Sequence, residues 1–325
     1  MEYRRLGSSD FEISRIGFGA WAAGGGDWAF ALGPQDDIES IAAIRRAIEL
    51  GINWIDTAPL YGLGHSEEIV ARALEGVASR PYVFTKCGMP RNADGRIIHS
   101  LRRDSIRREC EESLRRLRAD VIDLYQIHWN IPAEEVEEGL ETMARLQEEG
   151  KIRYSGVSNF TLPQLELAGD ITSPVSLQPP YSLLDREVED EILPFCKEHN
   201  IGVIIYSPMK SGLLSGKMTR ERIAEFPPDD LRRSKREFQE PELSRNLAVV
   251  ETLRAIADRR ETSVAEVAVA WTLHNPYVDG AIVGMRRPQH AESIIGAASV
   301  QLSPEDLAEI EDVLARNLTL SAEAF

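Results

Sequence analysis

Four titratable side chains stand at or just beyond the ends of short, apolar, strand-like segments: Asp56, Tyr61, Lys86 and His128. In a barrel of parallel strands such positions meet at one rim, where catalytic groups lie. Carbonyl reduction needs a proton donor at the oxygen, and tyrosine, with a pKa of about 10, is a weak acid for that task. A lysine ammonium beside the phenol is expected to lower this pKa, and a carboxylate can hold the ammonium in place. The set is therefore suited to carbonyl reduction.

Each of the four residues also has a structural explanation when it is taken alone. Asp56 and His128 could hydrogen-bond loop backbone, Tyr61 could be a rim aromatic, and Lys86 could form an ion pair at the barrel mouth. Their occurrence together at rim positions favours the catalytic interpretation. Within it, neutral His128 donates a ring N–H to the substrate oxygen and orients the carbonyl group.

The elements that must position these side chains alternate between β-branched runs and longer amphipathic segments. Repeated β–α units imply parallel strands, and runs that are apolar on both sides imply that both sheet faces are covered. Eight such runs without a Gly/Ser/Pro-rich linker predict an α/β fold, a closed (β/α)8 TIM barrel with residues 1–325 as one domain, rather than two doubly wound domains. The predicted strands are 16–19, 53–56, 82–85, 122–127, 152–157, 175–178, 203–206 and 280–283.

Additional segments at both ends and in the second half refine this barrel. The opening residues 3–13 have the chemistry of a β-hairpin around a Gly-Ser-Ser-Asp turn and are predicted to plug the bottom of the barrel. The segment 207–241 is long, rich in proline and charge and weakly periodic, and such a loop is unusual unless it binds or covers something. Helices are predicted near 36–50, 66–76, 104–118 and 134–148, with a C-terminal helix that starts at Ser303-Pro304-Glu305.

Composition and charge argue against several functional classes. The chain has 53 Asp and Glu against 37 Lys and Arg, and its net charge of −16 opposes attraction to nucleic acid or to an anionic membrane. Basic pairs such as Arg107-Arg108 and Arg115-Arg116 alternate with acids and are expected to form a solvated helix face. Three cysteines without CxxC spacing signal neither a disulfide framework nor a zinc site. With no secretory signal and no long apolar stretch, we expect a cytoplasmic protein without metal, nucleic-acid or membrane partners.

Three motifs contain the four rim residues and resemble one family. They are Asp56-Thr57-Ala58-Pro59-Leu60-Tyr61-Gly62, Thr85-Lys86-Cys87 and Tyr125-Gln126-Ile127-His128-Trp129, and segments at 156–160, 178–186 and 206–217 match in order. The chain resembles the aldo-keto reductase superfamily nearly end to end, and most of all its bacterial general-reductase and potassium-channel β-subunit branch. The resemblance implies reduction of small aldehydes or ketones with NADPH/NADP+. It makes Tyr61 the acid, Lys86 its modulator, His128 the orienting donor and Asp56 the partner of Lys86.

The resemblance also implies a set of cofactor and substrate contacts. Ser158, Asn159 and Gln178 would hold the nicotinamide carboxamide, Tyr206 would stack on the ring, and the loop 207–217 would line the pyrophosphate and ribose. The implied substrate contacts are Trp21, Tyr61, His128 and Trp129. The implied cofactor-binding residues are Gly19, Ala20, Trp21, Asp56, Ser158, Asn159, Gln178, Tyr206, Ser207, Pro208, Met209, Gly212, Leu213, Lys217, Gly284, Arg286 and His290.

The implied adenosine site lies at 282–290, where a strand leads into a helix N-terminus whose backbone N–H groups favour phosphate. Arg286 is expected to face the ribose 2′-phosphate of NADPH, and Arg287 to point to solvent. The chain departs from the branch's usual pattern here. His290 stands where Gln is common, and Ser293-Ile294 where an acid or amide followed by Asn is common.

Two other functions stay compatible with the sequence. A regulatory module could retain the cofactor and use its redox state to control a partner, as the channel-subunit resemblance permits. A different barrel enzyme could use a metal, although His128 lacks neighbouring ligands at metal spacing. Trp28 and Phe30 could line the substrate pocket or pack only on the glycine-rich loop 24–26. The candidate apolar pocket wall consists of Trp21, Trp28, Phe30, Leu60, Trp129 and Tyr181.

Overall fold

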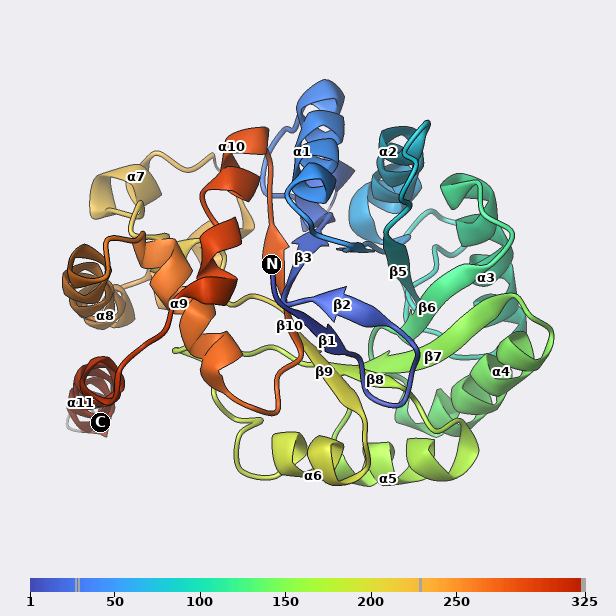
Figure 1. Ribbon diagram of the computed structural model, residues 1–325. Coiled ribbons are helices and arrows are strands. Elements are labelled where there is room, and N and C mark those ends of the chain that lie inside the picture. Colours follow the sequence, from blue (N-terminus) through green and yellow to red (C-terminus); the bar gives the residue numbers. More distant parts are fainter. Residues whose placement is uncertain (27, 29, 228–229, 323–325) are drawn as a thin grey trace.

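Eight parallel strands close into a barrel in the computed structural model, which describes residues 1–26, 28, 30–227 and 230–322. Neighbouring strands follow chain order around the barrel, and the last strand closes it against the first. Helices surround the barrel (Figure 1). The eight predicted strands and the (β/α)8 class are confirmed. The strands are β3 (Ile16–Gly19), β4 (Trp54–Asp56), β5 (Tyr82–Cys87), β6 (Ile122–Ile127), β7 (Ile152–Ser158), β8 (Ser176–Gln178), β9 (Gly202–Ile205) and β10 (Gly280–Gly284).

An N-terminal hairpin, β1 (Tyr3–Arg5) and β2 (Glu12–Ser14), lies across one end of the barrel (Figure 1). Its side chains Leu6, Phe11 and Ile13 are fully buried in one cluster with residues that point into the barrel, such as Trp54. The Trp54 indole nitrogen donates a hydrogen bond to the backbone oxygen of Ser14 at 2.8 Å. The predicted plug is therefore confirmed, and the barrel interior below the rim is a packed core.

Amphipathic helices cover the outer face of the barrel. The first helix begins near residue 36, as predicted, and the Asp36 side chain caps it by accepting a hydrogen bond from the backbone N–H of Glu39 at 2.9 Å. The C-terminal helix begins at Pro304, as predicted. The helices are α1 (Asp37–Glu49), α2 (His65–Leu74), α3 (Arg103–Leu117), α4 (Val136–Glu148), α5 (Leu162–Ile171), α6 (Ile192–Glu198), α8 (Glu242–Arg259), α9 (Val264–His274), α10 (Pro288–Glu292) and α11 (Pro304–Ala322).

The segment 207–241 has more structure than its composition suggests. Its described part contains a short helix and three 3-10 turns around a small apolar cluster that it shares with α8. The cluster consists of Leu213, Met218, Phe226, Phe238 and Leu243. The short elements are η4 (Leu213–Ser215), α7 (Arg220–Ala224), η5 (Leu231–Ser234) and η6 (Arg236–Phe238). A packed flap beside the barrel mouth therefore replaces the expected irregular loop.

One basic residue of α3, Arg116, is less solvated than the sequence suggests, whereas Arg103, Arg108 and Arg115 are exposed. Arg116 is largely buried, and its Nε donates a hydrogen bond at 2.6 Å to the fully buried carboxylate of Glu67 on α2. Arg107 pairs with Glu149, at the end of α4, at 2.8 Å. Arg116 keeps the expected pair within the helix, with Glu112 at 3.5 Å, but its shorter contact is to a buried carboxylate that is distant in sequence.

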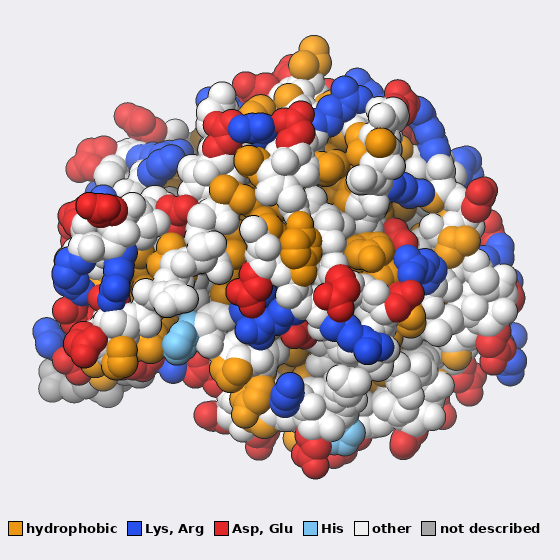
Figure 2. All heavy atoms as spheres, viewed as in Figure 1, with side chains coloured by type: hydrophobic (Ala, Val, Ile, Leu, Met, Phe, Trp, Pro, Cys, Tyr) orange, Lys and Arg blue, Asp and Glu red, His pale blue; other side chains and the backbone are white. Residues whose placement is uncertain are grey.

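The face of the molecule that carries the hairpin displays acidic and basic side chains interspersed (Figure 2). No single-sign field dominates this face, in spite of the net charge of −16. Within the described residues, no helix combines the length and the apolar character needed to cross a membrane.

Candidate active site

The structure brings Asp56, Tyr61, Lys86 and His128 together at the carboxyl ends of three neighbouring strands. The Lys86 ammonium donates hydrogen bonds to Asp56 Oδ1 at 2.6 Å and to the backbone oxygen of Thr57 at 3.0 Å. It also lies 3.4 Å from the Tyr61 hydroxyl. The rings of Tyr61 and His128 meet edge to face, with centroids 5.9 Å apart. The Lys86 side chain is fully buried, and only 4% of the Asp56 side chain is exposed. Water therefore screens the Lys86–Asp56 ion pair little.

Strand register sets the positions of three of these residues. Asp56 is the last residue of β4 and pairs with Gly19 of β3. Lys86 on β5 pairs with Gln126 on β6, two residues before His128. Because side chains alternate along a strand, Lys86 and Gln126 can both point toward the barrel axis.

Tyr61 begins a 3-10 turn, η2 (Tyr61–Gly64), which glycines hold against the first loop of the barrel. Gly62 has φ = +59°, a conformation that residues with a Cβ rarely adopt, and a Cβ there would overlap the backbone oxygen of Gly24. A Cβ on Gly24 would lie 2.6 Å from the backbone nitrogen of Gly62. The two loops therefore approach more closely than side chains allow, and this contact fixes where Tyr61 stands.

We expect Gly62→Ala to displace Tyr61 and to lower kcat for carbonyl reduction by about 10- to 100-fold, since small misplacements of reacting groups are costly. Steady-state kinetics measures the change. Gly76→Ala is the matched control, because Gly76 also has a positive φ, of +76°, but a Cβ there would meet nothing within 4 Å. Equal kcat values for the two variants would contradict the positioning role of the Gly24–Gly62 contact.

Burial controls protonation at this site. It raises the pKa of the Tyr61 hydroxyl well above its usual value, and the Asp56 carboxylate adds to the rise. Burial, together with the nearby Lys86 ammonium, lowers the pKa of His128 well below its usual value, so the imidazole is neutral. Burial also lowers the pKa of Lys86, while Asp56 opposes this change.

The expectation of a lowered Tyr61 pKa is therefore wrong, because burial raises it. Asp56 compensates the ammonium charge, and removal of water from the phenol favours its neutral form. Tyr61 consequently carries its proton throughout the neutral pH range and can serve as a donor without prior activation.

Aromatic rings form one wall beside Tyr61. Trp21 is stacked with the Tyr61 ring at a centroid distance of 6.0 Å and an interplanar angle of 15°. Trp28 lies 6.3 Å from the same ring, and its indole nitrogen donates to the backbone oxygen of Gly25 at 3.0 Å, so it both faces the site and packs on the glycine-rich loop. Phe30 and Leu60 belong to the same small apolar cluster.

Two other aromatic residues of the expected wall differ in exposure. Trp129, the residue after His128, is exposed and is therefore accessible to a substrate at the rim. Tyr181 is buried, stacks on Trp271 with centroids 5.3 Å apart, and donates its hydroxyl to Glu189 at 2.6 Å. Its expected place in the pocket wall is wrong, because its ring and its hydroxyl are both used in packing away from Tyr61.

The residues implied as nicotinamide contacts form one hydrogen-bonded group. Asn159 adopts φ = +60°, and its amide nitrogen donates to the backbone oxygen of His128 and to Ser158 Oγ, each at 3.0 Å. The Tyr206 hydroxyl donates to Asn159 Oδ1 at 2.9 Å, and burial raises its pKa to about 12. The Ser158 hydroxyl donates to the backbone oxygen of Gln178 at 2.7 Å. These bonds hold the side chains of Ser158, Asn159 and Tyr206 in fixed orientations on the rim.

The loop residues implied as cofactor contacts offer different groups. Ser207 and Gly212 adopt φ values of +58° and +89°, so the backbone turns sharply where the flap begins. Lys217 is exposed. The Leu213 side chain is fully buried in the cluster of the flap, which leaves only its backbone for a ligand. The remaining implied contacts follow strand ends on the same rim, with Gly19 and Ala20 at β3, Pro208 and Met209 beyond β9, and Gly284 at β10.

Arg286 is held by the first loop of the barrel rather than free. Its Nε donates to Gln35 Oε1 at 2.6 Å and one Nη donates to the backbone oxygen of Leu32 at 3.1 Å, while the other Nη contacts the backbone oxygen of Pro34. Gln35 in turn donates its amide nitrogen to the backbone oxygen of Arg286 at 2.8 Å. This clasp between Arg286 and Gln35 could not be predicted from sequence patterns, because its two sides are distant along the chain.

The residues around Arg286 explain part of the unusual sequence at 286–294. The ring nitrogen Nδ1 of His290 accepts a hydrogen bond from the backbone N–H of Arg286 at 3.2 Å, so this histidine supports the turn before α10. Ile294 is buried in the apolar core. Arg287 is exposed as expected and pairs with Glu39 at 3.3 Å.

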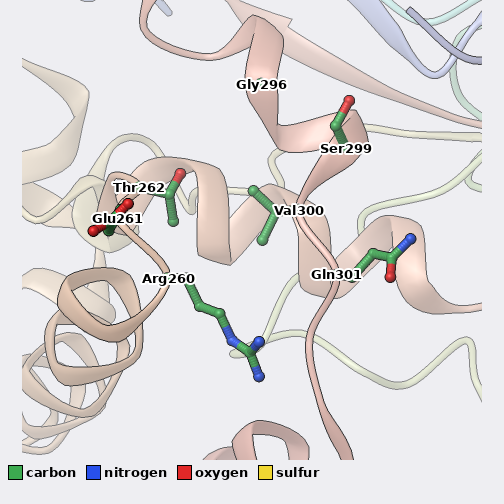
Figure 3. Close-up of a pocket in the computed structure, with 7 residues that line it drawn as sticks. All are labelled: Arg260, Glu261, Thr262, Gly296, Ser299, Val300 and Gln301. Atoms are coloured by element: carbon green, nitrogen blue, oxygen red, sulfur yellow. The ribbon is translucent and has the colours of Figure 1, made fainter.

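A hollow of about 460 Å³ lies away from these residues, between the end of α8 and the segment 296–301. Figure 3 shows that its side chains point in different directions rather than converging on one position. Its lining cation, Arg260, is already paired with Asp306 of α11. Among the residues that the structure describes, no three His, Cys, Asp or Glu side chains are grouped as metal ligands would be. The rim around Tyr61 is therefore the candidate active site.

Comparison with known proteins agrees with this geometry. The model of the aldo/keto reductase family matches residues 15–315. The chain is 39% identical to the aldo-keto reductase YhdN of Bacillus subtilis, over 98% of this chain and 95% of the relative. It is 33% identical to the NADH-specific methylglyoxal reductase of Escherichia coli, over 93% and 94%. Among solved structures, the glycerol dehydrogenase AKR11B4 from Gluconobacter oxydans superposes with a TM-score of 0.89 at 37% identity, covering 97% of this chain and 96% of that one.

Proposed function

Because the chain belongs to the aldo/keto reductase family, we propose that it reduces the carbonyl group of small aldehydes or ketones with NADPH. The buried Lys86–Asp56 pair beside the Tyr61 hydroxyl is the observation that carries the proposal. Tyr61 acts as the proton donor, His128 orients the carbonyl oxygen, Lys86 supplies the positive charge and Asp56 holds it. Residues 1–325 act as one catalytic domain.

These side chains act on the carbonyl oxygen. When it is bound, a reduced nicotinamide supplies the hydride for the carbonyl carbon. As charge develops on the oxygen, Tyr61 transfers its proton there, while neutral His128 directs a ring N–H to the same atom. The phenolate left behind is stabilised by the Lys86 ammonium, 3.4 Å from the tyrosine oxygen. Lys86 therefore acts on the charge that appears during the reaction rather than on the resting phenol.

The polar group around Gln178 fits a nicotinamide. Gln178 Nε2 already donates to Asp56 Oδ2 at 2.8 Å and to Gln126 Oε1 at 3.3 Å, so its carbonyl oxygen is the atom left to accept an amide N–H. Ser158 and Asn159 stand beside it in fixed orientations. These three residues would hold the carboxamide, and the Tyr206 ring would cover the nicotinamide.

Arg286 supports NADPH as the reduced cofactor, although one relative is named NADH-specific. A guanidinium suits a phosphate dianion better than it suits neutral acceptors. In the structure Arg286 has such neutral acceptors in Gln35 and two loop carbonyls. A 2′-phosphate would exchange them for a charged partner, and the N-terminus of the helix after Arg287 would add a favourable dipole.

We expect Arg286→Ala to weaken NADPH binding by roughly 10- to 100-fold and to change NADH binding little, because a charge-assisted contact is worth about 1.5–3 kcal/mol. Fluorescence titration with both cofactors measures the affinities. Arg287→Ala is the control and should have a much smaller effect, since that side chain is exposed and paired with Glu39. Equal losses of NADPH and NADH affinity in Arg286→Ala would mean that this arginine does not distinguish the two cofactors.

Steady-state oxidation of NADPH with 4-nitrobenzaldehyde, methylglyoxal and a broad panel of other carbonyls tests the proposed activity. We expect NADPH consumption that depends on both protein and carbonyl. A purified protein that binds NADPH but turns over no member of the panel would exclude the reductase and favour a regulatory cofactor-binding module.

A further inference from the structure

Gln126 is a buried amide that the proposed mechanism leaves without a role. It lies on β6, two residues before His128, and its side chain is fully shielded from solvent. The nearby layer of the barrel interior is mainly apolar, with Phe84, Leu124 and Ile282 among its members. An amide in such surroundings costs free energy unless its polar atoms are hydrogen-bonded, so its partners identify its role.

Three hydrogen bonds connect Gln126, Gln178 and Asp56 in a closed ring. Gln178 Nε2 donates to Asp56 Oδ2 at 2.8 Å and to Gln126 Oε1 at 3.3 Å. Gln126 Nε2 donates to Asp56 Oδ2 at 3.4 Å. Asp56 Oδ1 is meanwhile occupied by the Lys86 ammonium at 2.6 Å. Both amides therefore direct their nitrogen atoms toward the carboxylate, and neither can turn over without losing a bond to it.

The backbone near Gln126 leaves room for this amide. A Cβ on Gly156 of β7 would lie 3.1 Å from the Cγ atom of Gln126 and 2.6 Å from the hydroxyl of Ser176. A larger residue at position 156 would press on the glutamine side chain. The glycine on the neighbouring strand thus belongs to the packing that holds Gln126 against Asp56.

We infer that Gln126 is a positioning residue that couples cofactor binding to the proton-donating site, by fixing the Asp56 carboxylate toward Lys86 and the carbonyl oxygen of Gln178 toward the cofactor. The inference rests on the proposed function, since it assigns the nicotinamide carboxamide to Gln178. Through this ring one side chain supports both the cation beside Tyr61 and the amide that receives the cofactor. A residue that only filled space would affect neither.

The charges that face Lys86 determine how loss of Gln126 appears in a pH profile. Asp56 and the more distant Glu67 favour the ammonium, whereas burial opposes it, and His128 and Tyr61 contribute neutral groups. Lys86 must be protonated to stabilise the tyrosine phenolate. If Asp56 loses a hydrogen-bond donor and its fixed orientation, it supports the ammonium less, and Lys86 loses its proton at a lower pH.

The test compares Gln126→Met with Ser176→Ala in the full chain. Gln126→Met keeps the volume and removes the amide, while Ser176→Ala removes a buried hydroxyl of the same layer that forms no hydrogen bond with any described residue. For Gln126→Met we expect kcat/KM to fall by about tenfold, the dissociation constant of NADP+ to rise by about 3- to 10-fold, and the alkaline limb of kcat/KM to move to lower pH. Ser176→Ala should match the parent in all three measurements.

A second variant keeps the test decisive if methionine is not tolerated. Gln126→Glu keeps the shape but replaces the N–H donor with a second carboxyl group beside Asp56, so its activity loss should deepen as the pH rises. Unchanged NADP+ affinity and an unchanged alkaline limb in the folded variants would overturn the inference. If the parent protein reduced no carbonyl, the proposed function would fail first. An active parent whose Gln126 variants behave like Ser176→Ala would remove only the role of Gln126.

Discussion

Replacing Tyr61 with phenylalanine should lower kcat for carbonyl reduction by about 10²- to 10⁴-fold, the range typical of a lost general acid. This loss corresponds to about 3–5 kcal/mol of transition-state stabilisation. The phenylalanine ring can keep the stacking on Trp21, at 6.0 Å, and the edge contact with His128, so only the hydroxyl and its proton are removed. Cofactor affinity should therefore barely change.

Tyr125→Phe is the matched control for this measurement. Tyr125 is also a buried tyrosine whose pKa burial raises, but it packs in the apolar core between the strands and the helices rather than at the rim. Steady-state kinetics on both variants should show a large loss in Tyr61→Phe and near-parental kcat in Tyr125→Phe. A kcat for Tyr61→Phe within about threefold of the parent would show that Tyr61 is not the proton donor.

Lys86→Met should reduce both activity and stability. Without the ammonium, the phenolate formed from Tyr61 loses its stabilising charge, and we expect kcat to fall by about 10²-fold or more. The change also leaves the Asp56 carboxylate buried without its cation, and breaking a buried pair in this way costs about 3–5 kcal/mol of unfolding free energy. Denaturant unfolding followed by fluorescence measures the stability, and a pH series of kcat/KM measures the chemistry.

The double variant Lys86→Met/Asp56→Asn separates the two effects. It removes the uncompensated carboxylate, so it should recover most of the lost stability while its kcat stays low. The parent should lose activity at alkaline pH, where Lys86 gives up its proton. Because burial lowers the pKa of Lys86, this loss should occur at a lower pH than the usual lysine pKa. This limb should be absent in Lys86→Met. An unchanged pH profile in that variant would contradict the role assigned to Lys86.

The barrel could be predicted from sequence because its signals are local. Strand-like runs such as 203–206 are apolar and β-branched, and they recur between amphipathic segments, so the order of elements alone indicates a parallel closed sheet. The hairpin turn and the start of the first helix at Asp36 likewise depend on a few adjacent residues. The four rim residues follow from the strand ends once the barrel is accepted.

The features that sequence analysis missed depend on contacts between distant residues. Burial of Arg116 against Glu67 cannot be seen from helix periodicity, which reports only neighbours on the same helix. The flap at 207–241 has too few apolar residues in regular spacing to predict helices, although Phe226 and Phe238 form a cluster after folding. The clasp between Gln35 and Arg286 joins two loops on neighbouring strands.

The details of the candidate site were missed for related reasons. Gln126 carries no titratable group, and its position within a strand gives no sign that its amide meets Asp56. The rise in the pKa of Tyr61 depends on how completely water is removed, which residue spacing does not determine. Both features become visible only when the distances and the burial of the folded site are known.

Transfer of deuterium from NADPH labelled at nicotinamide C4 is the most direct test of the proposed reaction. Each of the two C4-deuterated diastereomers is incubated with the protein and 4-nitrobenzaldehyde, and the alcohol is analysed by mass spectrometry. We predict that one diastereomer alone gives an alcohol with a single deuterium on the former carbonyl carbon, and that Tyr61→Phe forms this product at least about 100-fold more slowly. An alcohol without deuterium from either diastereomer, or no alcohol from any carbonyl of the panel, would contradict the assignment of this rim as a carbonyl-reducing site.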